Sequence, residues 1–358
     1  MKTIQTSEIV KGMILSKDIF SHENVLFLSR GSILNEEHRK TLISLGIKYI
    51  DIFTDPEGNP FPEASRKNQE MLREKQFEKT YWEAVDTTEA ILNRLTRTRK
   101  FDEKEMVNTI QNLIPLTLTA GTNLLNLLHK IKNRNESIFT HLIGVSIFSI
   151  MIGKWLNKDE PRLIELGMAG IIHDLGKCQI PSIILNKPGP LSLKDYQHVQ
   201  KHSLYGFQLA LESNIRKTSI LSAILQHHER VDGSGYPYGI TANHIDETAK
   251  IVMVADIFEA LLANRPYRQP VNPFYAVEEI KAMAYNKLDP LIATTFIYRI
   301  ADYFIGSSVA LNNGEVGEVI SLDRLQPSAP MVRVQDRIYD LRLEPNLKII
   351  KDVVPPKG

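Results

Sequence analysis

Side chains of the types that bind metal ions are concentrated in one part of this chain. Six of its ten histidines lie between residues 141 and 228: His141, His173, His198, His202, His227 and His228. Aspartates accompany them in the tract His173-Asp174-Leu175-Gly176-Lys177 and at Asp256. Imidazole and carboxylate ligands without a thiolate suit Fe, Mn, Co, Ni or catalytic Zn better than a structural zinc. The pattern predicts a metal centre, for which we favour iron or manganese.

The two aspartates interrupt apolar stretches. Residues 163–172, just before His173 and Asp174, are almost entirely apolar, and Asp256 breaks the apolar run 251–258. A buried carboxylate is unfavourable unless a cation neutralises it. A metal ion would supply that cation. For Asp256 the alternative is a salt bridge to Arg265 or Arg268.

Spacing alone leaves the roles of the histidines open. His141 taken singly could be a hydrogen-bonded core residue. His198 and His202 are four residues apart and would share a helix face, so either could be a ligand. Neighbours on a helix point ~100° apart, so His227 and His228 can serve one site only if it is wide or holds several metals. The doublet therefore favours a multinuclear centre.

Basic side chains and a glycine-rich loop accompany these ligands. Two metals that share a carboxylate can hold a bridging hydroxide and stabilise the displacement at a phosphoester. Lys177, Arg265 and Arg268 are candidates for stabilising the developing charge, the alternative being ordinary surface charge. Tyr236 lies in the loop 232–239 with three glycines, where it could stack on a nucleotide or pack on its own domain. The residues predict a metal-dependent hydrolase.

Composition limits the partners and the compartment. With 43 Lys and Arg against 42 Asp and Glu, the net charge of +1 provides no general field for a nucleic acid polymer or an anionic membrane. The single cysteine, Cys178, excludes internal disulfides, fits a reducing compartment and is expected to be buried. Residues 1–8 lack signal-peptide character, and the apolar stretch 142–156 is short of the ~20 residues of a membrane span. We expect a soluble, cytoplasmic protein.

The elements predict a mainly α chain in four parts. Residues 1–54 mix a helix at 35–46, capped by Asn35, with short strands, as a small α+β module does. Residues 55–104 form a linker and a helical connector, whose helix at 66–99 either dimerises and transmits a signal or packs on its own domain. Long helical patterns fill 105–305. Residues 306–358 form a small β appendage that opens with an Asn-Gly hairpin.

These motifs resemble the HD-GYP subfamily of HD-domain phosphohydrolases over residues 135–290. The matching blocks, in chain order, are His173-Asp174-Leu175-Gly176-Lys177, Ile180-Pro181, Leu185-Asn186-Lys187-Pro188-Gly189-Pro190-Leu191, His202, His227-His228-Glu229-Arg230, Asp232-Gly233-Ser234-Gly235-Tyr236-Pro237, Ala255-Asp256 and Arg265-Pro266-Tyr267-Arg268. The resemblance implies a helical HD-domain bundle. It also implies hydrolysis of cyclic di-GMP to pGpG or on to GMP.

The resemblance assigns roles by position. One divalent metal would be held by His141, His173, Asp174 and Asp256, and a second, bridged by Asp174, by His202, His227 and His228; which of the paired histidines serves which metal stays open. His202 is thereby selected over His198. Lys177 would face the scissile phosphate, Arg265 and Arg268 would contact substrate phosphates, and Tyr236 would lie near the ligand.

One position departs from the family pattern. Members with a third metal have a glutamate four residues before the first histidine, where this chain has Ser137. We therefore expect two metals. The departure leaves open whether pGpG is the product and how efficiently it is hydrolysed further. Alternatives are a receptor or scaffold that binds cyclic di-GMP and signals through the 66–99 helix, and a phosphohydrolase of another cyclic dinucleotide. The predicted partners are cyclic di-GMP and a second copy of the chain, bound through the 66–99 helix. The N-terminal module would be regulatory.

Overall fold

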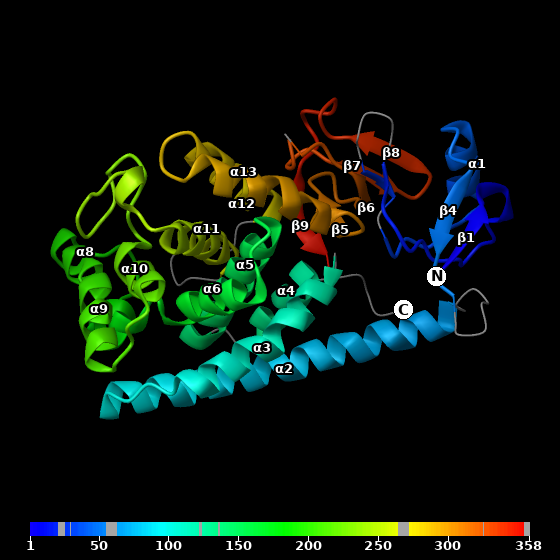
Figure 1. The fold of residues 1–358 in the computed structure, drawn as a ribbon. Coiled ribbons are helices and arrows are strands. Elements are labelled where there is room, and N and C mark those ends of the chain that lie inside the picture. The colour runs from blue at the N-terminus through cyan, green and yellow to red at the C-terminus, as the bar shows by residue number, and fades with distance from the viewer. Residues whose placement is uncertain are drawn as a thin grey trace. The chain divides into compact units, whose positions relative to one another are not determined.

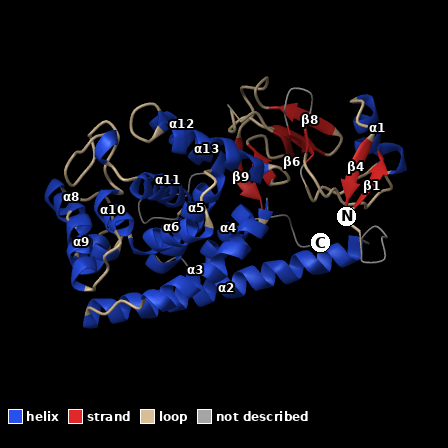
Figure 2. Cartoon of the chain, in the orientation of Figure 1, coloured by secondary structure: helices blue, strands red, loops and turns tan. Residues whose placement is uncertain are grey.

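Long apolar helices account for most of the structure, as the sequence predicts. The computed structural model describes residues 1–20, 26–28, 30–54, 63–121, 124–134, 137–263, 272–324 and 326–353. The chain divides into two compact units, residues 1–76 and 77–358. Helices dominate the second unit and strands gather near its C-terminal end (Figure 2), which confirms the predicted mainly α fold class.

The N-terminal unit is a small α+β structure. Strand β1 (Lys2–Gln5) pairs antiparallel with β4 (Tyr49–Ile52), and β2 (Ile19–Phe20) pairs with β3 (Leu26–Leu28). A short 3-10 helix, η1 (Thr6–Glu8), follows β1, and α1 (Glu36–Ser44) begins after Asn35, whose side chain accepts from the His38 amide at 2.8 Å. The predicted N-cap is confirmed. A core of apolar side chains, Leu15, Leu34, Leu42 and Ile52 among them, holds the unit together.

The second unit is a helical bundle (Figure 1). Its helices are α2 (Glu63–Thr98, which begins in the first unit), α3 (Glu103–Thr119), α4 (Leu124–Arg134), α5 (Ile138–Trp155), α6 (Glu160–Ile172), α7 (Ser182–Leu185), α8 (Leu193–Gln200), α9 (His202–Glu212), α10 (Thr218–Gln226), α11 (Glu247–Leu262), α12 (Pro273–Ala284) and α13 (Pro290–Ile300). Short 3-10 helices η3 (Leu175–Gln179), η4 (Ala242–His244) and η5 (Ala301–Phe304) lie between them.

Helix α5 is the centre of the bundle. It is apolar on every face, and α6 and α11 pack directly against it. Close contact with α6 depends on Gly170, where an added Cβ would lie 2.7 Å from the Ser146 backbone. By length and composition α5 could cross a membrane, but 72% of that window is buried inside the protein. Burial of this kind is typical of a core helix.

Helix α2 packs on its own unit over its C-terminal part. Phe77, Tyr81, Ile91 and Leu95 are buried in the core that the bundle shares. The Tyr81 hydroxyl donates to the Thr140 carbonyl at 3.0 Å, just before the first candidate ligand. Of the two interpretations of this helix, these contacts favour packing within its own domain; dimerisation through it stays a prediction.

The C-terminal part is an antiparallel sheet with strand order β8-β7-β6-β5-β9. Strands β5 (Ser308–Leu311) and β6 (Val316–Ser321) form the predicted hairpin, with Gly314 at φ 88° in its turn. The others are β7 (Met331–Val334), β8 (Arg337–Asp340) and β9 (Ile349–Val353). The inward residues of the sheet, Val309 and Val332 among them, belong to the same core as the helices.

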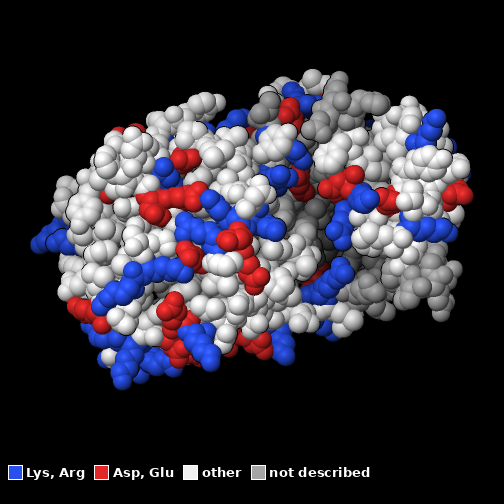
Figure 3. All heavy atoms as spheres, in the orientation of Figure 1, with Lys and Arg blue, Asp and Glu red and all other residues white. Residues whose placement is uncertain are grey.

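Charged side chains are interspersed on the molecular face seen in Figure 3. Basic and acidic groups alternate there, as the net charge of +1 suggests. Anion binding on this face would therefore depend on local groups rather than on a broad field of one sign.

Candidate metal centre

The candidate ligands lie mainly at helix ends. His141 is in the first turn of α5, after the N-cap Ser137, and His173 caps the C-terminal end of α6. Asp174 follows immediately and precedes η3, while Asp256 lies within α11. These side chains converge on one point because α5, α6 and α11 pack against one another.

His202, His227 and His228 come from α9 and α10. His202 is the first residue of α9, His227 is the C-cap of α10, and His228 follows it. The approach of η3 to α9 requires Gly176, because a Cβ there would lie 1.9 Å from the His202 carbonyl oxygen. This contact is what brings Asp174 beside His202.

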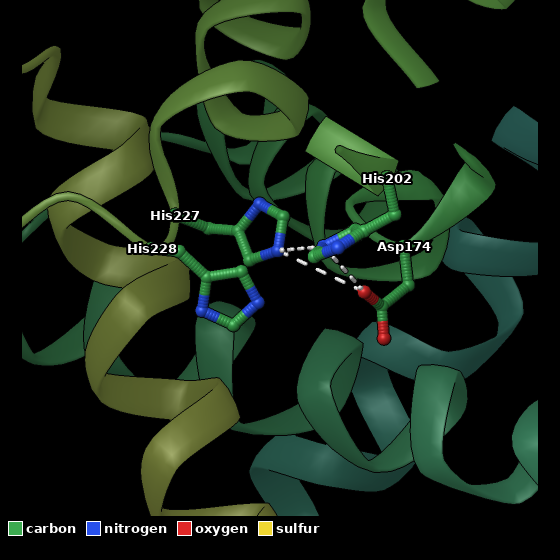
Figure 4. A group of neighbouring side chains, drawn as sticks. All are labelled: Asp174, His202, His227 and His228. Atoms are coloured by element: carbon green, nitrogen blue, oxygen red, sulfur yellow. Dashed lines mark hydrogen bonds and ion pairs between the residues drawn. The ribbon is translucent and has the colours of Figure 1, made fainter. Parts of the chain in front are cut away.

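The Asp174 carboxylate stands between two groups of ligands. Figure 4 shows it beside one of them, His202, His227 and His228. Asp174 Oδ1 lies 3.3 Å from His202 Nε2 and 3.7 Å from His227 Nε2. Its Oδ2 lies 3.3 Å from His173 Nε2 and 3.6 Å from His141 Nε2. One oxygen thus faces each group, which is the arrangement of a carboxylate that bridges two metal ions.

Each group has donors enough for a metal ion. Asp174, His202, His227 and His228 each offer an atom within 4.8 Å of the others, and so do His141, His173 and Asp256. Ligands that are 2.0–2.2 Å from a common ion lie about 3.0 to 3.4 Å from one another. The His202 and His227 Nε2 atoms are 3.2 Å apart, and His141 Nε2 is 3.4 Å from Asp256 Oδ1. These separations fit ligation without large movements.

Hydrogen bonds at the opposite ring nitrogens orient the imidazoles. Nδ1 of His173 lies 2.7 Å from the Gly170 carbonyl, Nδ1 of His202 lies 2.7 Å from the Val199 carbonyl, and Nδ1 of His227 lies 2.9 Å from the Ala223 carbonyl. A carbonyl oxygen only accepts, so these nitrogens carry the protons. Each Nε2 then has a free lone pair, as a metal ligand requires.

Three of the facing atoms have no hydrogen bond. His141 Nε2, His173 Nε2 and Asp174 Oδ1 are buried and unpaired by hydrogen bonding. Such atoms are costly inside a protein unless something satisfies them. All are good donors to a divalent cation, so the residues present fit a metal centre.

The protonation states also suit ligation. Burial lowers the pKa of His202 to about 4 and lowers the pKa values of His227 and His228, so these rings stay neutral. Burial would raise the Asp174 pKa, but Lys177 and His173 outweigh it and hold that pKa well below its usual range. For Asp256, burial is likewise outweighed by the close approach of His141 and by the charge of His173, and its pKa is held well below its usual range.

His141 differs from the other histidines. Burial opposes its charge, but Glu259, Asp174 and Asp256 together raise its pKa well above the usual value. The negative charge that attracts a proton to this ring would equally attract a dication, because both are cations in the same field.

Glu259 was not identified from the sequence. Its carboxylate is fully buried, contacts His141 Nδ1 through Oε2 and forms an ion pair with Lys132 through Oε1. The available signal was its position three residues after Asp256 in the apolar helix α11, which places both acids on one side of that helix.

The remaining candidates are placed as follows. Lys177 bonds to Asp174 Oδ2, and the Tyr236 ring stacks on His228 with 4.6 Å between centroids. His198 is on the separate helix α8 and belongs to neither ligand group of the described residues. Arg265 and Arg268, and with them the alternative salt bridge to Asp256, lie outside the described residues.

The expectation that Cys178 is buried is wrong. This cysteine is exposed. The reason is the 3-10 geometry of η3, in which Leu175 and Gly176 occupy the buried side of a tight turn and Cys178 points outward.

Buried Glu229 shapes the loop that carries Tyr236. Its Oε1 accepts from the Tyr238 amide at 2.8 Å and its Oε2 from the Ile240 amide at 3.1 Å. A Cβ on Gly235 would lie 2.4 Å from Glu229 Cα, so the loop backbone is held against this residue. The glycine-rich loop is thus fixed next to the ligand group of His228.

The helical part of the chain is similar to known proteins. The family described as HD domain matches residues 120–292. A cyclic di-GMP phosphodiesterase of Pseudomonas aeruginosa is 32% identical over 223 residues, 62% of this chain and 53% of that protein. A cyclic di-GMP phosphodiesterase response regulator of Xanthomonas campestris is 40% identical over 136 residues, 38% of this chain and 35% of that protein. The chain therefore spans about half the length, or less, of these curated relatives.

A solved structure has a similar fold. It is a protein of Bdellovibrio bacteriovorus described as a HDG"Y"P protein, with a TM-score of 0.51 and 17% identity. The alignment covers 82% of this chain and 97% of that one. At this identity the likeness concerns the fold alone.

Proposed function

We propose that this chain, whose residues 120–292 form an HD domain of the HD-GYP subfamily, is a metal-dependent phosphodiesterase that hydrolyses cyclic di-GMP to pGpG. The observation that carries the proposal is the Asp174 carboxylate, whose two oxygens face two separate ligand groups. A bridge of this kind suits cleavage of a phosphodiester bond, in which the attacking and the leaving oxygen both need stabilisation.

In this proposal the two ligand groups hold divalent metal ions. His141, His173, Asp174 and Asp256 would hold one, and Asp174, His202, His227 and His228 the other. Such ions supply Lewis acidity to the phosphate oxygens and lower the pKa of water. Imidazole and carboxylate ligands support iron or manganese as their identity.

Other residues would bind and orient the substrate. Lys177, partly exposed beside Asp174, offers a positive charge at the edge of the centre for a phosphate oxygen. Tyr236, stacked on His228, presents an aromatic ring next to the second ligand group, suited to contact with a base. By family resemblance Arg265 and Arg268 would add phosphate contacts.

A product assay tests the proposal. Protein purified without oxygen, loaded with Fe(II) or Mn(II) and incubated with cyclic di-GMP, should yield pGpG. His202→Ala should abolish turnover, whereas His198→Ala, a matched histidine outside the ligand groups, should leave it unchanged. Intact substrate under every metal, with metal bound, would refute the enzyme assignment.

A second substrate is worth testing because relatives act on it. A 3'3'-cGAMP-specific phosphodiesterase of Vibrio cholerae is 36% identical to this chain over 141 residues, 30% of that protein. Competition between 3'3'-cGAMP and cyclic di-GMP for the metal-loaded protein would separate the two substrates by their ratio of kcat/KM.

A receptor without activity is the candidate of another class. At the position where a third metal ligand occurs in the family, Ser137 caps α5 and its hydroxyl accepts from the Thr140 amide at 3.2 Å. The Ser137 side chain is therefore engaged in capping the N-terminus of α5. Nucleotide binding by calorimetry, without product, would favour the receptor.

The module assignments extend the proposal to the rest of the chain. We assign residues 1–54 to a regulatory module, 55–104 to a connector, 105–305 to the catalytic domain and 306–358 to the β appendage. A homodimer through the helix at 66–99 belongs to the same proposal, and sedimentation of the full chain would test it.

A further inference from the structure

Glu259 lies behind His141, on the side away from Asp174. Glu259 is on α11, three residues after Asp256, and its side chain is fully buried. Its Oε2 contacts His141 Nδ1, while His141 Nε2 faces Asp256 Oδ1 at 3.4 Å. The imidazole is therefore held between a carboxylate at one nitrogen and the candidate metal position at the other.

Lys132 fixes the carboxylate from a third helix. Its ammonium, on α4, pairs with Glu259 Oε1 and also lies 3.4 Å from the Glu259 carbonyl oxygen. The Lys132 side chain is only 10% exposed, so the pair is largely screened from solvent. A buried ion pair with added hydrogen bonds holds a fixed geometry better than an exposed one.

Gly144 provides the space that Glu259 occupies. It lies three residues after His141 on α5, and an added Cβ would come within 2.7 Å of Glu259 Oε1 and 2.8 Å of its Cγ. Any larger residue at this position would push the carboxylate from its place. Three helices thus contribute to the setting of one ring.

We propose that Glu259, held by Lys132 and accommodated by Gly144, is a positioning residue that fixes the His141 ring so that Nε2 faces Asp174 and Asp256. The other three histidines with a defined Nδ1 partner use backbone carbonyls of their own helical turn, or of the turn before them, for this purpose. His141 alone among these uses a distant acid. A carboxylate partner also makes the ring a stronger ligand.

This inference rests on the proposed function for the presence of a metal, and metal binding without substrate tests it. Co(II), added to the metal-free protein without oxygen, serves as the probe, with affinities from competition against a chelator and the d–d absorption as a sign of histidine ligation. Wild-type protein should bind two ions. Glu259→Gln should weaken one site by about 10- to 100-fold and leave the other unchanged.

Two pairs of variants distinguish positioning from loss of stability. Gly144→Ala keeps every charge and ligand but displaces Glu259, so it should weaken the same site. Gly153→Ala, also on α5, crowds Leu166 of α6 instead and should weaken neither site. Glu165→Gln, at a paired acid on α6, is the control for Glu259→Gln.

The outcomes are decisive. Selective loss of one Co(II) site in both Glu259→Gln and Gly144→Ala supports the inference. Equal weakening of both sites, or unchanged binding of both, overturns it. Two bound ions in the wild type with no hydrolysis of any cyclic dinucleotide would refute the proposed function and leave this inference standing.

Discussion

Replacing Gly176 by alanine should both destabilise the fold and impair one ligand group. Gly176 is in η3, two residues after Asp174, and an added Cβ would lie 1.9 Å from the His202 carbonyl oxygen and 2.4 Å from the Gly206 amide nitrogen. Both obstacles are backbone atoms of α9, which cannot rotate away as a side chain can. The two segments must therefore separate.

The size of the effect follows from these distances. Widening the 1.9 Å contact to the 3.4 Å of ordinary van der Waals contact moves the segments apart by about 1.5 Å. Overpacking a core typically costs 1–3 kcal/mol, and a backbone clash belongs at the upper end, so we expect about 3 kcal/mol. The same movement would carry Asp174 Oδ1 away from His202 Nε2, now 3.3 Å distant. The ligand group of His202 should lose affinity.

Urea denaturation of the metal-free protein and Co(II) titration measure the two effects. Gly206→Ala is the matched control, because its Cβ would meet Gly176 N and the Ile224 side chain at 2.9 Å, a much smaller misfit. We expect about 1 kcal/mol for the control. Gly176→Ala protein as stable as Gly206→Ala, with both ions bound as in the wild type, would refute the reasoning.

Three further predictions follow from other parts of the structure. Glu229→Gln should cost about 1–3 kcal/mol and raise KM, because the Tyr238 and Ile240 amides donate to different oxygens of Glu229, one of which becomes an NH2 donor in glutamine; unchanged hydrogen exchange at these two amides would contradict it. Lys217 and Arg162 outweigh burial and lower the Glu165 pKa, so Glu165→Gln should cost about 1 kcal/mol of stability or less. The whole loss should be present above the ordinary glutamate pKa and should shrink as the pH falls below it. Urea midpoints from pH 7 to 4 measure this, and a loss that grows in acid would contradict the prediction. Removing the metal with a chelator should lower Tm. When the free metal concentration is 100 times the Kd of a site, the free energy of unfolding that is lost is about 2.7 kcal/mol, and an unchanged Tm would argue against tight sites.

The helical fold could be predicted because its signals, apolar stretches and helix caps, lie within each helix or next to it in the sequence. Apolar residues predominate in α5, α6 and α11, and Asn35 is followed by two acidic residues, which favour a helix start there. The Asn-Gly hairpin of β5 and β6 is equally local. Close approaches that depend on a glycine could not be predicted in this way. The roles of Gly144 and Gly176 depend on which helices meet, and the packing of the whole core decides that.

The candidate ligands were predicted by type, but their spacing was misleading in two places. His198 and His202 do not share a helix face, because α8 ends at Gln200 and α9 begins at His202. His227 and His228 lie at and beyond the end of α10, so the angle between neighbours in a helix does not separate them, and both fall in one group. Periodicity holds only within a continuous helix, and the sequence does not mark these breaks.

The charges around the centre explain why its ligands need a cation from outside the chain. Lys177 pairs with Asp174 and Lys132 pairs with Glu259, which accounts for two of the three acids that lie against His141, namely Asp174, Asp256 and Glu259. Among the described residues Asp256 forms ion pairs only with His141 and His173, whose rings must be neutral to act as ligands. With neutral rings one negative charge remains buried and unbalanced, a costly state at low dielectric. A divalent ion between these residues removes the imbalance and satisfies the unpaired Nε2 atoms at the same time, whereas a proton on one ring could balance the charge only by removing a ligand.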